Sequence, residues 1–388
     1  MVILLGVLER LKPLSPGQEN MLAALNDPEA EVIGIFGPSG SGKSLFSIAY
    51  GVDAILNNKF RRFLVVKPLV NVVSGAGIGL DAGRDVFESL VMDYLSDIAS
   101  TLQIENELGD LLKRRAIQIV DLHYLKGRTF DESLVFIDDI QNMPAESVIE
   151  VLIRVGNKSR LIVAGDPVFQ RLRRVERDSS AIIREILLGE EKARVVDLGL
   201  ADVVRPGARR GLKLMMELIL RGRAMSEEER KIADIVYRYA PDADIISVVD
   251  AGKAKEIYGV KGEGIPDVFI FTKTPGRLIG KGGERIQKIE SESGRKLRGV
   301  ELVLAFKEWI RAIHPVTWVY KHIVEADFAG PRLRIRIDRD GAGAFIGQGG
   351  SNIRFFEHIL EELLGIGVQL EQVEVKAEKG RKRRSEQS

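Results

Sequence analysis

The sequence predicts an α/β domain built on a parallel sheet, followed by two small α+β domains. Between residues 31 and 222, short apolar runs rich in β-branched residues alternate with helical stretches, a pattern typical of strands buried on both faces of a parallel sheet. Beyond residue 222, a strand, a glycine-rich loop, a helix and a further strand occur twice. The loops begin 67 residues apart, at Gly280 and Gly347, a spacing that favours tandem domains over a solenoid, whose periods are about 20 to 50 residues.

The elements of the first domain follow one another along the chain. We expect strands at 31–36, 62–66, 117–121, 134–138, 160–164 and 193–198. We expect helices at 43–54, 145–155, 179–188 and from about 207 to 221. The glycine-rich segment 75–83 interrupts this alternation and predicts an ordered insertion or a mobile loop.

A new helix start follows residue 222. Ser226 and Glu229 form a capping box, which predicts a helix over 228–239. The first copy of the repeat then has strands at 267–272 and near 300–304; the second has a helix at 306–313 and strands at 333–337 and 368–375. The expected domains are 1–222, 223–305 and 306–378. A basic tail, 379–388, is either a solvated end or a nucleic-acid contact.

Composition excludes several classes of site. The 388 residues include no Cys and four His, which excludes a disulfide framework, a thiolate zinc site, an iron–sulfur cluster, a Cys nucleophile and a His-rich metal site. The net charge of +1 hides an asymmetry, because residues 261–388 hold 23 Lys and Arg against 18 Asp and Glu. The apolar opening, 1–8, is short and runs into Glu9, so we expect neither a signal peptide nor a membrane span, and a cytoplasmic protein.

Residues 37–44 fit G-x-x-x-x-G-K-[ST], the pattern of a phosphate-binding loop. Glycines let the backbone N–H groups turn toward the phosphates, Lys43 reaches the β and γ oxygens, and Ser44 offers its hydroxyl to Mg²⁺. A strand precedes the loop and a helix follows it, so the helix N-terminus also favours the anion. The expected nucleotide-binding residues here are Gly37, Pro38, Ser39, Gly40, Ser41, Gly42, Lys43 and Ser44.

A second strand supplies carboxylates to the same edge of the sheet. The strand at 134–138 ends in Asp138 and Asp139, where parallel strands present their C-terminal ends to a ligand. We expect Ser44 and, through water, Asp138 to hold Mg²⁺, and Asp139 to polarise the attacking water; the alternative is that both acids cap the next helix. Gln170, after a further strand, would position that water or sense the γ-phosphate.

The base is inferred from a missing motif. A GTPase normally carries N-K-x-D, but the Asn-Lys pairs at 58–59 and 157–158 are not followed by the required Asp. ATP is therefore the expected nucleotide.

In their order along residues 12–222, these motifs resemble the PhoH-like ATPases, relatives of superfamily 1 helicases with a RecA-like P-loop sheet. The features that carry the resemblance are Gln18, the phosphate-binding loop, Lys67-Pro68, the glycine-rich insertion, 125–129, Asp138-Asp139-x-Gln141, 165–170 and 202–205. The resemblance implies that Gln18 contacts adenine, and that Arg205 and Arg128 contact the γ-phosphate or a neighbouring subunit; the alternative for Arg205 is a surface salt bridge. The family usually has Glu in place of Asp139, and the shorter carboxylate predicts weak uncoupled ATPase activity.

The two repeated loops resemble those of K-homology (KH) domains, in which a G-x-x-G loop between two helices clamps about four nucleotides. The order of helices and strands resembles the type II arrangement. The expected contacts with nucleic acid are Gly280, Lys281, Gly282, Gly283, Gly347, Gln348, Gly349 and Gly350. The second loop has no cation, so we expect weaker phosphate contact there; the alternative is a degenerate copy that only scaffolds an oligomer.

A PhoH-like ATPase followed by tandem KH domains resembles archaeal ATPases, some of which carry an additional N-terminal PIN domain. We expect no PIN domain here, because no acidic nuclease cluster precedes the phosphate-binding loop. The resemblance implies an ATP-driven motor, a homohexameric ring without membrane contact, and single-stranded RNA or DNA as partner, with branch migration of DNA junctions as one task. The alternative is an ATP-gated RNA-binding protein that does not translocate.

Overall fold

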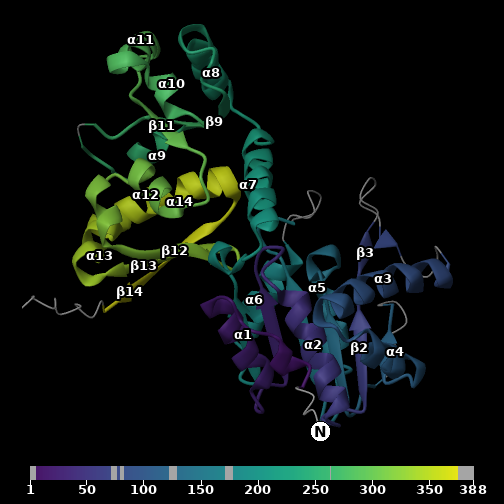
Figure 1. Cartoon of the computed structure of the whole chain (residues 1–388). Helices are drawn as coiled ribbons and strands as arrows, with labels where there is room; N and C mark the ends of the chain where they lie inside the picture. The colour runs from purple at the N-terminus through teal and green to yellow at the C-terminus, as the bar shows by residue number, and fades with distance from the viewer. Residues whose placement is uncertain are drawn as a thin grey trace, which may run out of the picture. The chain divides into compact units, whose positions relative to one another are not determined.

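The computed structural model describes residues 6–70, 77–78, 83–121, 129–170, 178–262 and 264–374. The chain forms two compact units, Met1–Leu218 with Asp327–Arg332, and Ile219–Ala326 with Leu333–Ser388. Figure 1 labels many of the elements of each. The sequence did not predict that the short segment Asp327–Arg332, which joins two strands of the second repeat copy, packs as part of the first unit.

A six-stranded parallel sheet forms the centre of the first unit, in the order β5-β2-β6-β7-β1-β8. Its strands are β1 (Val32–Phe36), β2 (Arg62–Val66), β5 (Ile117–Ile119), β6 (Ser133–Ile137), β7 (Arg160–Gly165) and β8 (Ala193–Asp197). Every residue of β1, β6 and β7 is buried, which confirms that the continuous apolar runs are strands covered on both faces.

Helices cover both faces of this sheet. One core joins Ile33 and Ile35 of β1 to α1, α2, α3 and α4, and the other joins Val32 and Phe36 to α5 and α6. Neighbouring residues of β1 contribute to different cores because successive side chains along a strand point to opposite faces of the sheet. These helices are α1 (Pro16–Asn26), α2 (Lys43–Leu56), α3 (Arg84–Leu102), α4 (Glu105–Lys113), α5 (Ala145–Leu152) and α6 (Ser179–Leu188), and α7 (Pro206–Arg221) follows them in the chain. Shorter elements are η1 (Leu8–Arg10), η4 (Ile140–Asn142), η5 (Leu200–Asp202) and the ribbon β3 (Leu69–Val70) with β4 (Gly77–Ile78).

The second unit contains the predicted repeat. The first copy consists of α8 (Glu227–Tyr239), β9 (Ile245–Asp250), α9 (Gly252–Ile257), β10 (Val268–Thr272), α10 (Pro275–Ile279), α11 (Glu284–Ser293) and β11 (Leu297–Glu301). The second consists of α12 (Phe306–Ile313), η7 (Thr317–His322), β12 (Ile323–Ala329), β13 (Arg332–Asp338), α13 (Arg339–Ile346), α14 (Ser351–Leu364) and β14 (Gly367–Val373). Each copy therefore has a helix, two strands, two helices that flank the glycine loop, and a third strand in a three-stranded sheet.

One predicted boundary in the first copy is wrong. The third strand begins at Leu297, three residues before the expected 300–304, because its register runs from Val268–Leu297 to Thr272–Glu301. The capping box of α8 is confirmed, since Ser226 and Glu229 exchange both hydrogen bonds. Among the described residues, no helix has the length and apolar character needed to cross a membrane.

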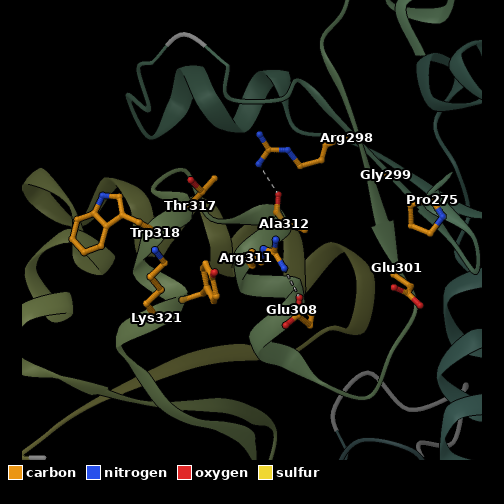
Figure 2. A pocket seen from close by; sticks show the side chains of 11 residues that line it. Pro275, Arg298, Gly299, Glu301, Glu308, Arg311, Ala312, Thr317, Trp318 and Lys321 are labelled. Carbon is orange, nitrogen blue, oxygen red and sulfur yellow. Dashed lines mark hydrogen bonds and ion pairs between the residues drawn. The ribbon is translucent and has the colours of Figure 1, made fainter. Parts of the chain in front are cut away.

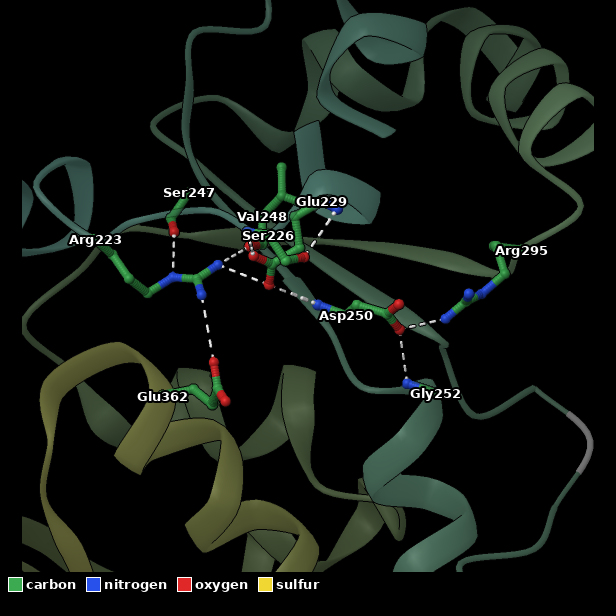
Figure 3. A network of polar contacts seen from close by, with 9 residues as sticks. All are labelled: Arg223, Ser226, Glu229, Ser247, Val248, Asp250, Gly252, Arg295 and Glu362. Atoms are coloured by element: carbon green, nitrogen blue, oxygen red, sulfur yellow. Dashed lines mark hydrogen bonds and ion pairs between the residues drawn. The ribbon is translucent and has the colours of Figure 1, made fainter. Parts of the chain in front are cut away.

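Arg223 ties the two copies together, as Figure 3 shows. Its guanidinium donates to Glu229 of α8 at 2.8 Å, to Ser247 of β9 at 3.2 Å and to Glu362 of α14 at 3.3 Å. Glu229 also accepts from the backbone N–H of Asp250 at 3.1 Å. One arginine and one carboxylate therefore join the first helix and strand of copy one to the long helix of copy two.

A buried histidine supports the second glycine loop. His314 is fully buried, its ring stacks on Phe345 at 4.5 Å between centroids, and its Nε2 lies 3.0 Å from the carbonyl oxygen of Phe345. The backbone N–H of Val316 donates to Nδ1 at 3.1 Å, so Nε2 carries the proton. Burial lowers the pKa of His314, which keeps the ring neutral.

We expect the second unit to lose stability as the pH falls below about 6.5, the ordinary histidine pKa, because the unfolded chain then binds a proton that folded His314 resists. The slope has an upper limit of about 1.4 kcal/mol per pH unit. Both tryptophans of the chain, Trp309 and Trp318, lie in this unit, so urea unfolding followed by tryptophan fluorescence reports on it. His314→Gln should flatten the slope; an equal slope in variant and wild type would contradict this assignment.

Candidate nucleotide site and nucleic-acid loops

The phosphate-binding loop lies between the end of β1 and the start of α2. Gly37, Gly40 and Gly42 have φ angles of +156°, +86° and +98°, which favour glycine. A Cβ on Gly37 would stand 2.5 Å from the carbonyl oxygen of Leu198. Gly42 caps α2 without a side-chain hydrogen bond, so the first N–H groups of the helix are left for an anion.

Lys43, the first residue of α2, is buried against this loop. Its ammonium donates to the carbonyl oxygens of Gly37 at 2.7 Å and Pro38 at 3.0 Å. Burial lowers the pKa of Lys43, and the carboxylate of Asp166 is the strongest charge opposing that shift. Asp166 follows β7 and accepts from the backbone N–H of Ser39 at 3.2 Å, while burial raises its own pKa. The loop, the lysine and this acid therefore pack as one group.

Asp138 is the centre of a second buried group at the same sheet edge. It has no exposed surface, and its Oδ2 accepts from Ser44 at 2.8 Å, Lys67 at 2.9 Å and Tyr94 at 2.8 Å. Burial, the largest single effect, would raise the pKa of Asp138, but the Lys67 ammonium and the hydrogen bonds from Lys67, Ser44 and Tyr94 together hold the pKa below its ordinary value. Burial would lower the pKa of Lys67, but the carboxylates of Asp138 and Asp139 together raise it. Asp138 is thus held as an ionised carboxylate.

Asp139 and Gln170 are joined through Gln141. Asp139 has a left-handed backbone with a φ of +50°, and its carboxylate accepts a hydrogen bond from the ammonium of Lys67. The amide nitrogen of Gln141 donates to Asp139 at 3.1 Å and to Gln170 at 2.7 Å, and its oxygen accepts from the backbone N–H of Asp166 at 3.0 Å. The structure therefore brings the expected water-orienting residues together beside Asp138, the expected metal-binding acid.

The donors at this edge fit a magnesium ion. Ser44 and Asp138 offer a hydroxyl and a carboxylate in direct contact, with Asp139 adjacent, and Mg²⁺ is usually held by one or two carboxylates together with substrate phosphates. Within the part of the chain that the structure describes, no group of three or more His, Asp or Glu side chains could enclose a metal alone. A metal here would therefore depend on the nucleotide for its remaining ligands.

Gln18 and Arg205 both lie close to the phosphate-binding loop. The amide nitrogen of Gln18 donates to the carbonyl oxygens of Ser41 at 3.1 Å and Asp202 at 3.4 Å, and its side chain is buried. Arg205 is exposed, and its guanidinium lies 3.8 Å from where a Cβ on Gly40 would stand. Arg128 and most of the glycine-rich insertion lie outside the described residues.

Replacing Lys67, the cation that contacts Asp138 and Asp139, should lower the stability of the first unit. We expect Lys67→Met to destabilise the first unit by about 3 to 5 kcal/mol, because Asp138 would remain buried without its partner. Lys67→Arg should cost less, since it keeps the charge. Urea unfolding followed by circular dichroism reports the change, and Lys113→Met, at a lysine whose side chain is 81% exposed, is the matched control. Equal stability of the two methionine variants would contradict the pairing.

The two glycine loops of the second unit share one backbone conformation. The first follows α10 and precedes α11; the second follows α13 and precedes α14. The glycines have φ angles of +75°, +62° and +84° at Gly280, Gly282 and Gly283, and of +73°, +62° and +81° at Gly347, Gly349 and Gly350. Equal dihedral angles at equivalent positions mean that both loops present their N–H groups in the same way.

Both loops leave room for a phosphate backbone to approach. A Cβ built on Gly282 or Gly349 would have no atom within 4 Å, and the helices that follow have no side-chain cap at their N-termini. The loops differ in the residue after the first glycine, which is Lys281 in one and Gln348 in the other. The two loops therefore share their backbone geometry, but only the first carries a positive charge.

Comparison with known proteins gives a consistent assignment for both units. A family model described as "PhoH-like protein" matches residues 10–217, more than half of the chain. A model described as "KH domain" matches residues 255–325. The first match covers the phosphate-binding loop and the acid pair, and the second covers the first glycine loop.

Curated relatives match about half of the chain. A PhoH-like protein of Bacillus subtilis is 29% identical over 49% of this chain and 58% of its own length. A PhoH-like protein of Synechocystis is 31% identical over 44% of this chain and 51% of its own length, and Protein PhoH2 of Mycolicibacterium smegmatis is 28% identical over 46% and 41%. The chain thus spans about half the length of these relatives.

Solved structures resemble the chain less closely. Domain III of the Thermotoga maritima replication initiation protein DnaA gives a TM-score of 0.26 at 14% identity, covering 66% of this chain and 91% of that one. A TM-score of this size supports no argument from fold.

Proposed function

Because the chain belongs to the PhoH-like family and carries a KH domain, we propose that it is an ATPase whose hydrolysis drives work on single-stranded nucleic acid. The observation that carries the proposal is the presence of two sets of binding features on one chain. The first unit holds a phosphate-binding loop beside an ionised buried acid. The second holds two loops of matching backbone conformation.

In the first unit, the residues divide the work on ATP. The loop at 37–42 and the N-terminus of α2 receive the phosphates, and Lys43 offsets the negative charge that develops during phosphoryl transfer. Ser44 and Asp138 would hold Mg²⁺, which supplies charge neutralisation at the phosphate oxygens. Asp139 orients the attacking water, with Gln170 placed through Gln141 to sense the γ-phosphate.

In the second unit, we assign residues 223–305 and 306–378 to two KH modules. The closely similar φ angles support this assignment, as does the helix–strand–strand–helix–helix–strand order that the two copies share apart from α9 and η7. Phosphates of a single strand would meet the backbone N–H groups at 280–283 and 347–350. Lys281 adds a cation to the first loop, so the first copy should bind the strand more tightly than the second.

The finer proposal is a helicase or translocase, with branch migration of DNA junctions as one task. The second candidate is an ATP-gated RNA-binding protein that does not translocate. The KH match supports it, because a KH domain can bind a single strand without moving along it. Strand displacement separates them. A motor unwinds a partial duplex only with hydrolysable ATP, whereas a binder shifts the single strand in a gel and never releases the complementary one.

For assembly, we propose a homo-oligomeric ring, expected to be a hexamer, with each ATP site completed by an arginine of a neighbouring subunit. Arg205 is a candidate because it is exposed beside the phosphate-binding loop; Arg128 is the other. Mixing Lys43→Ala with Arg205→Ala tests this arrangement. Recovery of turnover in the mixture supports shared sites, and a mixture as inactive as either variant alone excludes a trans role for Arg205.

A further inference from the structure

A pocket of about 550 Å³ lies where the two repeat copies meet in the second unit. One wall comes from the first copy, with Pro275 at the start of α10 and Arg298 and Gly299 of β11. The other comes from α12 and η7 of the second copy, with Arg311, Trp318 and Tyr320. Figure 2 labels Pro275, Arg298, Arg311 and Trp318 among the lining residues, with the Trp318 ring at the end away from Pro275. We call it the repeat-junction pocket.

The pocket lies next to the first glycine loop along the chain. Pro275 opens the five-residue helix α10, which ends one residue before Gly280. A Cβ on Gly299 would stand 3.1 Å from Leu278 and 3.3 Å from Pro275, so the missing side chain of Gly299 lets α10 pack closely on β11. A strand clamped at 280–283 therefore has its neighbouring nucleotides within reach of this pocket.

Aromatic rings line the side formed by the second copy. Trp318 is 47% exposed, although the other tryptophan of the chain, Trp309, is fully buried. The Trp318 ring is held edge-on by His322, with 5.3 Å between centroids at 78°, and the guanidinium of Arg311 lies 5.2 Å from the centroid of Tyr320. Exposed aromatic faces and arginine planes are the groups on which proteins stack unpaired bases.

The wall formed by the first copy carries Arg298, a cation that has no carboxylate partner among the described residues. Arg298 donates to the carbonyl oxygens of Ala312 at 3.0 Å and Gly264 at 3.2 Å, and burial lowers its pKa with no compensating acid. Glu308 pairs with Arg311 at 3.4 Å, whereas Glu301 has no cation partner among the described residues. The pocket thus offers a free positive charge, an exposed ring and a free acceptor.

We propose that the repeat-junction pocket binds a short unstacked stretch of the single strand held by the loop at 280–283. One base of this stretch stacks on Trp318, one of its phosphates meets Arg298, and Glu301 is the acceptor for an amino group of a neighbouring base. This inference rests on the proposed function, because it requires that the second unit binds single-stranded nucleic acid.

Tryptophan fluorescence of the full chain tests the pocket directly. Because Trp309 is buried, a ligand that stacks in the pocket should quench Trp318, and Trp318→Phe should remove that quench. The probes are hexacytidylate, whose bases carry amino groups, and an abasic hexamer with the same phosphates. We expect hexacytidylate to quench, the abasic hexamer not to quench, and Trp318→Ala to weaken hexacytidylate binding about fivefold or more.

The controls separate stacking from general effects. Tyr237→Ala removes an aromatic side chain of α8 that is 50% exposed outside the pocket, and it should leave the affinity unchanged. Arg298→Gln should reduce the slope of log affinity against log salt by about 0.7, the value for one phosphate contact on a single strand.

The outcomes also separate this inference from the proposed function. If labelled hexacytidylate binds by fluorescence polarisation but neither quenches Trp318 nor responds to Trp318→Ala, the pocket proposal is overturned and nucleic-acid binding stands. Equal quenching by the abasic hexamer overturns base stacking. If no oligonucleotide binds at all, both proposals fail together.

Discussion

Lys43→Ala should reduce ATP turnover at least about hundredfold, the scale of losing one preorganised group that stabilises transition-state charge. Lys43 is the buried cation of the phosphate-binding loop, and its ammonium already contacts the loop carbonyl oxygens at 2.7 and 3.0 Å. An alanine leaves the loop without that charge while the second unit keeps both glycine loops. Steady-state hydrolysis gives the rate, and gel shift of a single strand should show binding retained.

Lys113→Ala is the matched control, because Lys113 lies on α4 with an exposed side chain. Circular dichroism checks that the first unit remains folded in both variants, since neither tryptophan lies there. Turnover within a few-fold of wild type in Lys43→Ala would contradict the placement of ATP in this loop.

The double change Gly282→Asp and Gly349→Asp should weaken single-strand binding about tenfold or more, because a carboxylate in each loop repels the phosphates. Both glycines have a φ of +62° and open space around the Cβ position. The new side chains therefore project outward without a clash. Hydrolysis measured without nucleic acid should continue.

Two controls separate charge from backbone strain. Asn at the same two positions carries a similar shape without charge and should retain most of the affinity. Gly294→Asp places the same residue at a φ of +66° after α11, again with nothing within 4 Å, but outside the loop. Between the single variants, Gly282→Asp should have the larger effect, since Lys281 lies in its loop. Equal losses in the Asp and Asn variants would assign the effect to strain.

The sequence predicted much of the fold because the first unit's strands are continuous apolar runs and its loop glycines stand at a fixed spacing. It did not assign functions to Lys67, Tyr94 or Gln141, although all three contact the acids of the candidate site. Tyr94 lies in the middle of α3, where nothing local distinguishes it from a core aromatic residue. Its contact with Asp138 depends on how α3 packs against the sheet, which residue spacing does not reveal.

The C-terminal repeat also contains contacts that could not be predicted from residue spacing. The glycine loops and the capping box could be predicted because each is a local pattern of a few residues. The contact of Asp327 with the backbone N–H groups of Leu200 and Ala201, at 2.7 and 2.8 Å, joins residues more than 120 positions apart. No short motif marks such a contact, so the assignment of that segment to the first unit was missed.

The central claim is that ATP hydrolysis in the first unit responds to a single strand bound by the second. The most direct measurement is the steady-state hydrolysis rate as single-stranded RNA, single-stranded DNA or a four-way junction is added to the full chain. The account predicts a saturable rise in rate with at least one of them, and no rise in the double variant Gly282→Asp and Gly349→Asp. A wild-type rate that stays constant with all three would contradict it.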